Sequence, residues 1–493
     1  MRRRDLIRAA MGAAAASTFT NASAWAQDIP AVTLSDGETT LTKADIKAFA
    51  EGLNGIVLRP DSDGYDIARE LWNKYWDLRP ALIAKCNGVE DVIATVNFAR
   101  EHDLLTAVRC GGHSMSGKSM CDGGLVIDMT PMNNVDVDVR NKIASVEGGA
   151  QLGNMDRMTQ PLGLGTTAGV VSHTGVGGLT LGGGMGRLQR RFGLAIDNVL
   201  GVEIVTADGK LLRANEKENP DLYWGVRGGG GNFGVVTKFF FRLHPMNQTI
   251  LNFFFSIPME YAKDALKLYF DFSMSAREDV FAMGGVSMQP DGTGNARISG
   301  NYFGPFSEID QMLRPIRNFG KATVDRVYPM QYVDVQRSND DGVNAPGRRR
   351  YAKGGFLRNI DEGLINTIVD RMEPLPTRHI GVGLLPMDGA PARVGADETV
   401  WAHRDALYNI DSTSNWAVSD SDMDAQNISW NRAYWKDVEP FLGGGFYVNA
   451  LMDEDQGQIN SNYGHNHARL VEVKNTYDPT NFFRLNANVQ PTV

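Results

Sequence analysis

A glycine-rich stretch near residue 110 combines two side chains that a cofactor or phosphate site would use. The stretch reads GGHSMSGKS from Gly111 to Ser119 and contains an imidazole, His113, and an amine, Lys118. From Gly112 it also satisfies the phosphate-loop pattern G-x-x-x-x-G-K-[ST]. A phosphate loop must be followed by a helix whose N-terminus faces the phosphates. The following residues, CDGGLVIDM, predict a turn and an apolar strand instead, so we expect no phosphate loop here.

Two other local patterns are also expected to be coincidental. Gly229–Gly234 satisfies G-x-G-x-x-G, but the residues that follow, VVTKFFFRLH, predict a strand, whereas the dinucleotide fingerprint opens a helix. A structural zinc site needs four ligands. Neither the pair Cys110 and His113 nor the pair His465 and His467 has a companion pair nearby, so we expect no metal site.

Three glycine-rich stretches lie within a short part of the chain, at residues 111–117, 175–186 and 228–234. Glycine exposes backbone N–H groups that side chains do not obstruct, and successive N–H groups bind anions. The alternative is that the glycines form tight turns in a β-rich fold. Because the stretches alternate with short predicted strands, we favour an extended ligand that carries a diphosphate.

Composition narrows the class of partner and the number of domains. The chain has 493 residues and a formal charge of −9, so it offers no basic excess for nucleic acid, and its length predicts two or three domains. Cys86, Cys110 and Cys121 are its three cysteines, so at least one thiol must be unpaired.

The first 26 residues have the features of an export signal. A basic start precedes an apolar run that is too short to span a bilayer, and Ala24-Trp25-Ala26 is a small-x-small cleavage site. Arg3 and Arg4 suggest the twin-arginine route, which exports folded proteins; an ordinary secretory signal is the alternative. We expect a periplasmic or secreted protein, and no later apolar run is long enough for a membrane span.

Several ordered segments resemble one known family. VRCGGHSMSGKSMCDGGLVIDM, TTAGVVSHTGVGGLTLGGGMG and DLYWGVRGGGGNFGVVT resemble the three FAD-binding stretches of berberine-bridge-enzyme-like FAD-linked oxidases, a branch of the vanillyl-alcohol-oxidase superfamily. RLVEVKNTYDPTNFFRLNANVQP resembles the C-terminal tail of that family. The resemblance covers nearly the whole chain after the export signal.

The resemblance implies an α/β (α+β) fold with an FAD-binding domain of the vanillyl-alcohol-oxidase type in two parts. The first part is expected at residues 27–246, and residues 445–493 return to it. Residues 247–444 are expected to form a substrate domain, an antiparallel sheet backed by helices. The segment 334–356 reads as a polar, glycine-rich loop beside the pocket, in which Arg348, Arg349 and Arg350 are expected to be solvated rather than to bind an acidic substrate.

The resemblance also implies the residues that contact FAD, with His113 as the covalent 8α-histidyl anchor. A neutral imidazole nitrogen is a suitable nucleophile, and a covalent link raises the flavin potential. The expected contacts are Arg109, Cys110, Gly111, Gly112, His113 and Ser114; Gly169, Thr174, Gly175, Gly177, Gly178 and Gly182; Asn198 and Ile204; Gly231 and Val236; and, in the tail, an asparagine expected at position 485, where the chain has Leu485 followed by Asn486.

Two departures from the family pattern affect the chemistry. Members with a second covalent bond to the flavin carry a cysteine where this chain has Val171, so a single attachment is expected. Many members carry two tyrosines before a glycine in the tail, and here Asn462 replaces the first. Tyr463 is therefore our first candidate for the catalytic base and Tyr447 the second; the alternative for both is a packing role.

The implied reaction is hydride transfer from a small alcohol, sugar, amine or phenolic substrate to flavin N5, followed by reoxidation. Thr174 stands where relatives have a small apolar residue associated with oxygen access, and we expect O2 as the acceptor. The alternatives are a dehydrogenase that uses a quinone or another acceptor, and a flavin- or ligand-binding protein that has lost turnover.

The arginine pair generates the first prediction. Replacing Arg3 and Arg4 by lysine should retain the protein in the cytoplasm with its flavin bound, because the route reads the guanidinium pair. Cell fractionation measures this, with a second variant that also replaces Arg2 as a control. Undiminished export of both variants would contradict the twin-arginine route.

Overall fold

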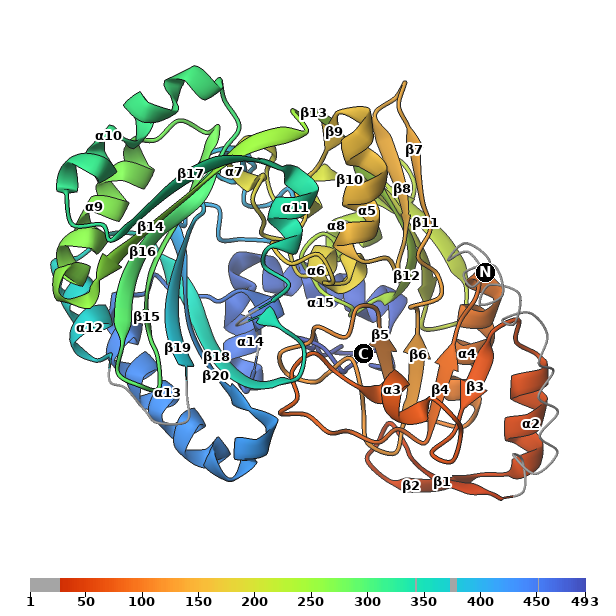
Figure 1. Cartoon of the computed structure of the whole chain (residues 1–493). Helices are drawn as coiled ribbons and strands as arrows, with labels where there is room; N and C mark the ends of the chain where they lie inside the picture. Colours follow the sequence, from red (N-terminus) through yellow and green to blue (C-terminus); the bar gives the residue numbers. More distant parts are fainter. Residues whose placement is uncertain (1–26, 342–343, 373–378, 451) are drawn as a thin grey trace, which may run out of the picture.

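The computed structural model describes residues 27–341, 344–372, 379–450 and 452–493. The expected export signal, residues 1–26, lies outside them. Within these ranges, no helix has both the length and the apolar character needed to cross a membrane. Figure 1 shows a first domain with two sheets on one side and a second domain with one large sheet on the other.

The smaller sheet of the first domain is built around a parallel crossover. Strands β4 and β5 both run parallel to β6, which lies between them, and β3 is antiparallel at the edge. Helix α4 connects β4 to β5 and buries Val92, Val96 and Ala99, whose spacing places them on one helical face. The strands are β3 Ile56–Leu58, β4 Leu82–Lys85, β5 Thr106–Arg109 and β6 Leu125–Asp128.

The larger sheet of the first domain is antiparallel, in the order β11-β10-β12-β8-β7. Its strands are β7 Val135–Asp138, β8 Ile143–Glu147, β10 Val199–Thr206, β11 Leu211–Asn215 and β12 Gly234–Arg242. The helices of the domain are α2 Lys43–Glu51, α3 Tyr65–Arg69, α4 Val89–Glu101, α5 Leu152–Thr159, α6 Val176–Leu181, α7 Gln189–Phe192 and α8 Pro220–Val226. Two small hairpin or bridge pairs complete it: β1 Ile29–Val32 with β2 Glu38–Leu41, and β9 Leu164–Gly165 with β13 His244–Pro245.

The two coincidental nucleotide-binding patterns are both followed by strands, as the sequence predicts. The segment with the phosphate-loop pattern connects β5 to β6, and β12 begins at the last glycine of the G-x-G-x-x-G pattern. Neither loop is followed by a helix whose N-terminus is able to face a phosphate.

The second domain is one antiparallel sheet of seven strands in the order β17-β14-β16-β15-β19-β20-β18. Its strands are β14 Thr249–Pro258, β15 Val280–Met288, β16 Gly294–Tyr302, β17 Val324–Gln331, β18 Arg348–Leu357, β19 His379–Pro386 and β20 Tyr408–Ala417. Its helices are α9 Ala262–Ser275, α10 Ile309–Phe319, α11 Tyr332–Arg337, α12 Glu362–Asp370 and α13 Asp424–Val438. This is the expected sheet backed by helices.

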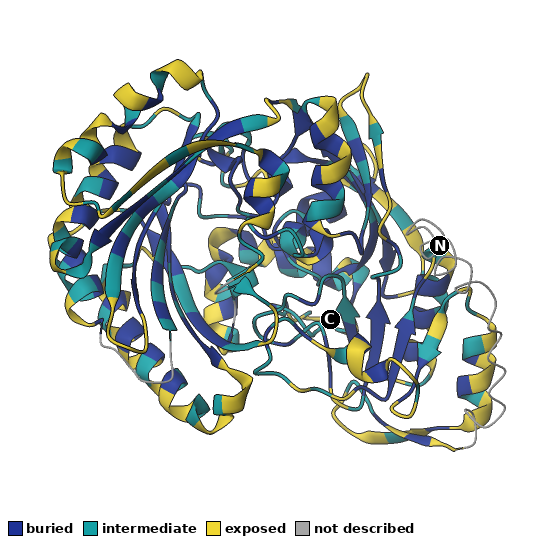
Figure 2. Cartoon of the chain, viewed as in Figure 1, coloured by how far each residue is buried: buried dark blue, intermediate teal, exposed yellow. Residues whose placement is uncertain are grey.

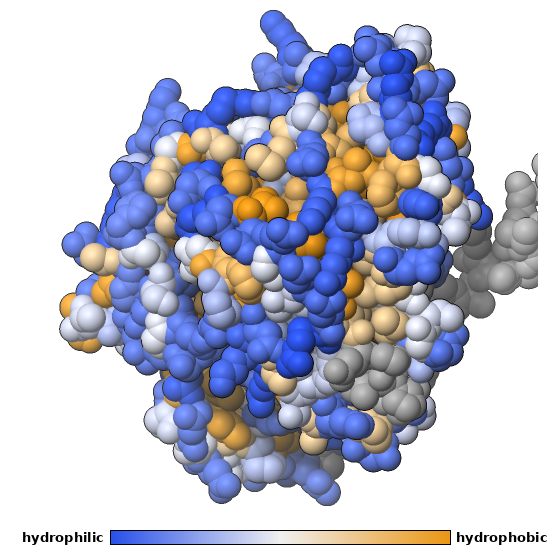
Figure 3. All heavy atoms as spheres, turned by 90° about the vertical axis from the view of Figure 1, so that its left-hand side faces the viewer, coloured by the Kyte–Doolittle hydropathy of each residue, from blue (hydrophilic) through white to orange (hydrophobic). Residues whose placement is uncertain are grey.

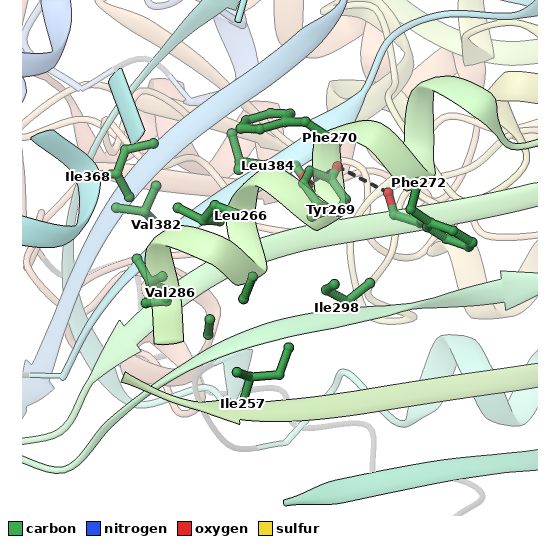
Figure 4. Packing of buried hydrophobic residues seen from close by; sticks show 14 of the residues in the cluster. Ile257, Leu266, Tyr269, Phe270, Phe272, Val286, Ile298, Ile368, Val382 and Leu384 are labelled. Carbon is green, nitrogen blue, oxygen red and sulfur yellow. Dashed lines mark hydrogen bonds between the residues drawn. The ribbon is translucent and has the colours of Figure 1, made fainter. Parts of the chain in front are cut away.

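Helices α9, α10, α12 and α13 lie along the outer side of this sheet (Figure 1). Leu266 and Phe270 of α9 pack against Val286, Ile298 and Val382 of the strands (Figure 4). The strands are largely buried, whereas the outward faces of these helices are exposed (Figure 2). Figure 3 shows that hydrophilic residues cover most of this outer surface, with apolar residues visible between them. The helices therefore shield one face of the sheet from water.

The opposite face of the sheet looks toward the first domain. On β20, Ile410 belongs to the apolar core under the helices, and Ser412 accepts a hydrogen bond from Asn431 of α13. Because strand side chains alternate, Asp411 and Thr413 must point the other way. The same alternation turns Arg297 of β16 toward the first domain. We call this side the inner face.

The C-terminal segment returns to the first domain. It contains three short elements and one longer helix: η9 Val448–Ala450, α14 Gln456–Asn462, η10 Gly464–Asn466 and α15 His467–Tyr477. Leu470 and Val473 of α15 join the core of the larger sheet. Asn232 of the third glycine stretch donates a hydrogen bond to the Ala487 carbonyl (2.9 Å), and its Oδ1 accepts one from the Val489 N–H (2.9 Å).

The prediction of a pocket-side loop at 334–356 is partly wrong. Its start lies in α11, and its end forms β18, the edge strand that pairs with β20. The arginines are not solvated: Arg350 is only 1% exposed, and Arg349 forms an ion pair with Asp424 (Nε–Oδ1 2.7 Å). The β-branched and aromatic content is low in this strand, so its pairing with β20 overrides local preference.

The buried ion pair of Lys474 and Asp478 generates a stability prediction. Both side chains are fully buried, and Lys474 Nζ also donates to the carbonyls of Asn232 and Phe483. Lys474→Met would leave the Asp478 carboxylate buried without its cation, so we expect a loss of about 3–5 kcal/mol in the free energy of unfolding. Denaturant unfolding measures it.

The control is Lys436→Met, which changes an exposed lysine of α13 and should alter stability by less than about 0.5 kcal/mol. Equal stability of the two variants would show that the buried pair does not hold the tail in place.

Candidate functional site

The first two glycine stretches touch each other backbone to backbone. A Cβ atom placed on Gly111 would lie 2.3 Å from the backbone nitrogen of Gly175, and one on Gly175 would lie 2.4 Å from Cys110 Sγ. Either distance is too short for two non-bonded atoms. These two glycines therefore allow the loop after β5 and the segment before α6 to pack directly together.

Other glycines of the three stretches border open space. A Cβ atom on Gly178 would have no neighbour within 4 Å, and one on Gly231 would meet only Asn486 Nδ2 at 4.0 Å. The side-chain oxygens of Asn486 and Asn488 in the tail are buried and have no hydrogen-bond partner among the described residues. A buried acceptor without a partner is costly unless a ligand satisfies it.

His113 is held on two sides. Its ring stacks on Trp72, with centroids 4.7 Å apart and planes 15° from parallel. Its Nε2 lies 2.6 Å from Nδ1 of His173, and its Nδ1 lies 3.4 Å from Oγ1 of Thr174. The contact between the first two glycine stretches thus brings His113 to the segment that precedes α6.

The surroundings of His113 keep its imidazole neutral. Burial is the main cause that lowers its pKa to about 3, and the neighbouring His173 and Arg350 lower it further. Arg350 lies with its guanidinium 3.6 Å from the centre of the Trp72 ring, on which His113 also stacks. A neutral imidazole keeps one nitrogen lone pair, which is what a nucleophile requires.

Two of the expected FAD contacts, Ile204 and Val236, are brought together by the larger sheet. Ile204 of β10 is paired with Val236 of β12. A Cβ on Gly148 would lie 2.1 Å from the Val236 carbonyl oxygen, and one on Gly177 would lie 2.7 Å from the Gly148 carbonyl oxygen. Gly177 of the second glycine stretch and Val236, which follows the third stretch, therefore both lie against Gly148.

Several other predicted contact residues already lie in contact with other parts of the protein. Asn198 donates to the carbonyls of Phe192 and Leu194 and contacts His244 Nε2 at 2.7 Å. Arg109 forms a 3.5 Å ion pair with buried Asp128. A Cβ on Gly169 would lie 2.5 Å from Leu152, and one on Gly182 would lie 2.2 Å from Asn449.

The remaining predicted positions lie in the first glycine stretch or directly before it. Cys110 is one of three free thiols, and burial raises its pKa. Ser114 Oγ lies 3.4 Å from Ser116 Oγ. Gly112 has a φ of +67°, so this turn of the loop favours glycine.

Tyr463, the first candidate base, lies in the core of the first domain. It is 3% exposed, and its hydroxyl donates to the Ala487 carbonyl at 3.3 Å. Burial raises its pKa well above the usual value, which opposes formation of a phenolate. This environment favours the packing role, which also ties the tail to α14.

Tyr447 lies nearer the inner face. Its hydroxyl oxygen accepts hydrogen bonds from the Met185 N–H (3.2 Å) and from Asn449 Nδ2 (2.8 Å), and its ring contacts Trp401. The two donors favour the phenolate, but burial raises the pKa of Tyr447 above its usual value. Met185 and Trp401 place this hydroxyl beside the second glycine stretch.

Asp411 is a candidate base that the sequence reasoning missed. It lies on the inner face in register with Gly383 of β19 and Gly354 of β18, two positions without side chains. Burial raises its pKa to about 6, although the hydrogen bond from Thr413 and the charge of Arg297 both lower it. The alternating segment YNIDSTSNW contains the signal, a carboxylate among residues that face away from an apolar core.

Comparisons with known proteins agree with this geometry. A family model described as an FAD binding domain matches residues 80–215, and one described as berberine and berberine like matches residues 446–490. An FAD-linked oxidoreductase of Dictyostelium discoideum is 33% identical over 453 residues, which cover 90% of this chain and 97% of that protein. The chain belongs to the berberine-bridge-enzyme-like family of FAD-linked oxidoreductases.

Solved structures show the same fold. The structure of 6-hydroxy-D-nicotine oxidase from Arthrobacter nicotinovorans aligns with a TM-score of 0.83 at 26% identity, covering 89% of this chain and 98% of that one. Glucooligosaccharide oxidase from Acremonium strictum also aligns with a TM-score of 0.83, at 24% identity, covering 91% of this chain and all of that one.

FAD fits the residues of this berberine-bridge-enzyme-like chain. The open space beside Gly178 and Gly231 and the unpartnered oxygens of Asn486 and Asn488 are features that a large polar cofactor would fill and satisfy. The asparagine expected at position 485 is absent, because Leu485 stands there and packs in an apolar cluster. Its neighbour Asn486 supplies the unpartnered amide oxygen instead.

The two kinds of glycine generate a prediction. Gly178→Val should weaken the binding of FAD to apo-protein by at least about tenfold, because its side chain would enter the space left for the cofactor. It should not lower the melting temperature of the apo-protein, because a Cβ atom there meets nothing. Flavin fluorescence titration and thermal unfolding measure the two effects.

Gly175→Val is the matched control. Its side chain would collide with Gly111 and Cys110, so it should lower the melting temperature with or without FAD. If Gly178→Val instead destabilises the apo-protein and leaves FAD affinity unchanged, Gly178 does not line the cofactor site.

Proposed function

We propose that this FAD-linked oxidoreductase is exported, binds FAD covalently through His113 alone, and oxidises a small organic substrate with O2 as acceptor. The observation that carries the proposal is the neutral His113, held by Trp72 and His173 where the first two glycine stretches meet. Val171 provides no thiol for a second bond.

Relatives support the covalent link and the substrate class. The solved glucooligosaccharide oxidase is named for a 6-S-cysteinyl, 8α-N1-histidyl FAD. Relatives named (R)-6-hydroxynicotine oxidase and glucooligosaccharide oxidase are 26% and 27% identical to this chain. Their names refer to an amine that carries a hydroxylated pyridine ring and to a sugar, so an alcohol, sugar, amine or phenolic compound is the class of substrate we propose here.

Bound FAD would supply the acceptor for a hydride from the substrate carbon. The protein must orient the substrate and take the proton from its O–H or N–H group. Asp411 is the residue we propose for this proton, because its carboxylate lies on the inner face and its raised pKa brings it near neutral pH. Tyr447 is the second candidate, with its oxygen already held by two N–H donors.

Arg297 has a different part in this arrangement. Its charge acts on Asp411 along one row of the inner face, in which only Gly285 of β15 and Gly383 of β19 stand between the two residues. Burial lowers the pKa of Arg297 without removing its charge. A fixed cation near the base lets the carboxylate form despite burial. Gly354 and Gly383 place no side chain beside Asp411, and the carboxylate lies over Gly383, where a Cβ atom would be 2.7 Å from Oδ2.

Two alternatives predict different behaviour of the flavin. A dehydrogenase would be reoxidised much faster by a quinone or a dye than by air, and the polar, branched side chain of Thr174 is the feature that would shield the flavin from oxygen. A protein without turnover would not bleach its flavin with any substrate under anaerobic conditions. A screen of sugars, amines and phenolic alcohols by anaerobic bleaching tests for turnover, and reoxidation of the reduced enzyme by air against a quinone or a dye then separates the oxidase from the dehydrogenase.

Removal of the anchor tests the covalent link. Wild-type protein precipitated with acid should keep its yellow colour in the pellet, and His113→Ala should release all flavin into the supernatant. If the variant still binds FAD, it should oxidise substrate more slowly, because loss of the link lowers the flavin potential. Retention of flavin by His113→Ala after precipitation would show attachment at another residue.

The pH profile tests Asp411. We expect kcat/KM to rise with pH up to about 6 and then level off, because the base must be ionised and Asp411 has a raised pKa of about 6. Asp411→Asn should lower kcat/KM by about 10²–10⁴-fold and remove this rise.

Thr413→Val provides a directional control. Thr413 Oγ1 donates a hydrogen bond to Asp411 Oδ1 (3.2 Å), which lowers the pKa of the carboxyl, so its loss should move the midpoint to higher pH. An unchanged midpoint in both variants would assign the proton transfer to another group.

A further inference from the structure

We infer that His173 is a positioning residue for covalent attachment: it fixes the tautomer of His113 and receives its Nε2 proton. The inference rests on the proposed function, in which His113 carries the flavin. None of the family features used above requires a histidine at this position, and the sequence reasoning gave it no role.

The two imidazoles form a close pair. His113 Nε2 and His173 Nδ1 are 2.6 Å apart, and the ring centroids are 4.7 Å apart with planes at 39°. Nε2 of His173 is buried and has no hydrogen-bond partner among the described residues. The short contact to His113 is therefore the polar interaction that the structure gives to the His173 ring.

The backbone around His173 is fixed on both sides. The N–H of Ser172 donates to Asp340 Oδ1 (2.8 Å), and its hydroxyl donates to Asp340 Oδ2 (2.5 Å). The N–H of Thr174 donates to the Val171 carbonyl (3.2 Å). These contacts hold the backbone on both sides of His173, next to the short contact of its ring with His113.

The pair determines which nitrogen of His113 is the nucleophile. A neutral imidazole carries its proton on one nitrogen and a lone pair on the other. When His173 Nδ1 accepts the hydrogen bond, the proton is on Nε2 of His113, and Nδ1 keeps the lone pair. That nitrogen has the weaker contact, 3.4 Å from Thr174 Oγ1, so it is free to form the bond to the flavin.

The same contact provides for the proton that attachment releases. The reaction replaces one C–H bond of the flavin 8-methyl group and the Nε2–H bond of His113 with one C–N bond at Nδ1. The released pair of electrons and two protons pass to dioxygen, which becomes hydrogen peroxide. His173 Nδ1 accepts the Nε2 proton as the C–N bond forms and then gives it up as one of the two protons that dioxygen takes, so neither ring remains a buried cation.

Two variants of similar size separate the hydrogen bond from packing. His173→Asn keeps an amide oxygen near the place of Nδ1, and His173→Leu fills the volume without an acceptor. Each apo-protein is mixed with FAD in air, and the flavin in acid-precipitated pellets is measured over time. We expect attachment in His173→Leu to be on the order of a hundredfold slower than in wild type, and His173→Asn to restore most of the rate.

Reversible FAD binding before attachment serves as the folding control, because neither variant changes a residue of the glycine stretches or of the C-terminal tail. Equal rates of attachment in wild type and His173→Leu would overturn the inference. Wild-type protein that releases all its flavin in acid would instead contradict the proposed function, so the two failures are distinguishable.

A second measurement needs no variant. Proteolysis of the wild-type holoenzyme gives a flavinyl peptide, and NMR of its imidazole identifies the substituted nitrogen. Substitution at Nδ1 supports the tautomer that His173 selects, and substitution at Nε2 overturns it, because Nε2 is the nitrogen that faces His173.

Discussion

Close contact between two glycine backbones is the constraint on which the site depends. Gly111 and Gly175 approach so closely that a Cβ on either would overlap the other segment. The contact joins the loop after β5, in the smaller sheet, to the segment before α6, above the larger sheet. Because these two segments meet, His113 reaches His173 and Thr174 across 60 residues of sequence. The position of His113 therefore depends on the absence of side chains at Gly111 and Gly175.

The second domain contributes through the simple alternation of its strands. One set of side chains forms the apolar core under α9, α10, α12 and α13, and the other set, with Arg297 and Asp411, faces the first domain. The helices exclude water from one side only, so the polar inner face is available to a substrate. The C-terminal segment is held against the third glycine stretch. Its Lys474 donates a hydrogen bond to the Asn232 carbonyl, and Asn232 donates one to the Ala487 carbonyl.

Local patterns in the sequence predicted the strands after the first and third glycine stretches, and the family resemblance implied the sheet backed by helices. They did not distinguish glycines that allow backbone contact, such as Gly111, from glycines that border open space, such as Gly178, because both look alike without their neighbours. Arg350 was misjudged for the same reason: its burial depends on Trp72, almost 280 residues earlier in the chain. The pair of His113 with His173 also arises from long-range packing, so no local pattern identified it. Asp411 does lie in an alternating segment, but its place beside Gly354 and Gly383 depends on strands far away in the chain.

The most direct test of a flavin bound covalently to His113 is peptide mapping of the purified protein by mass spectrometry. Trypsin should release the peptide Cys110–Lys118, CGGHSMSGK. We expect this peptide to carry the added mass of one FAD, or of the flavin mononucleotide left after its hydrolysis, with fragmentation placing it on His113. An unmodified peptide in a protein that oxidises substrate, or a flavin on any other residue, would contradict the anchor.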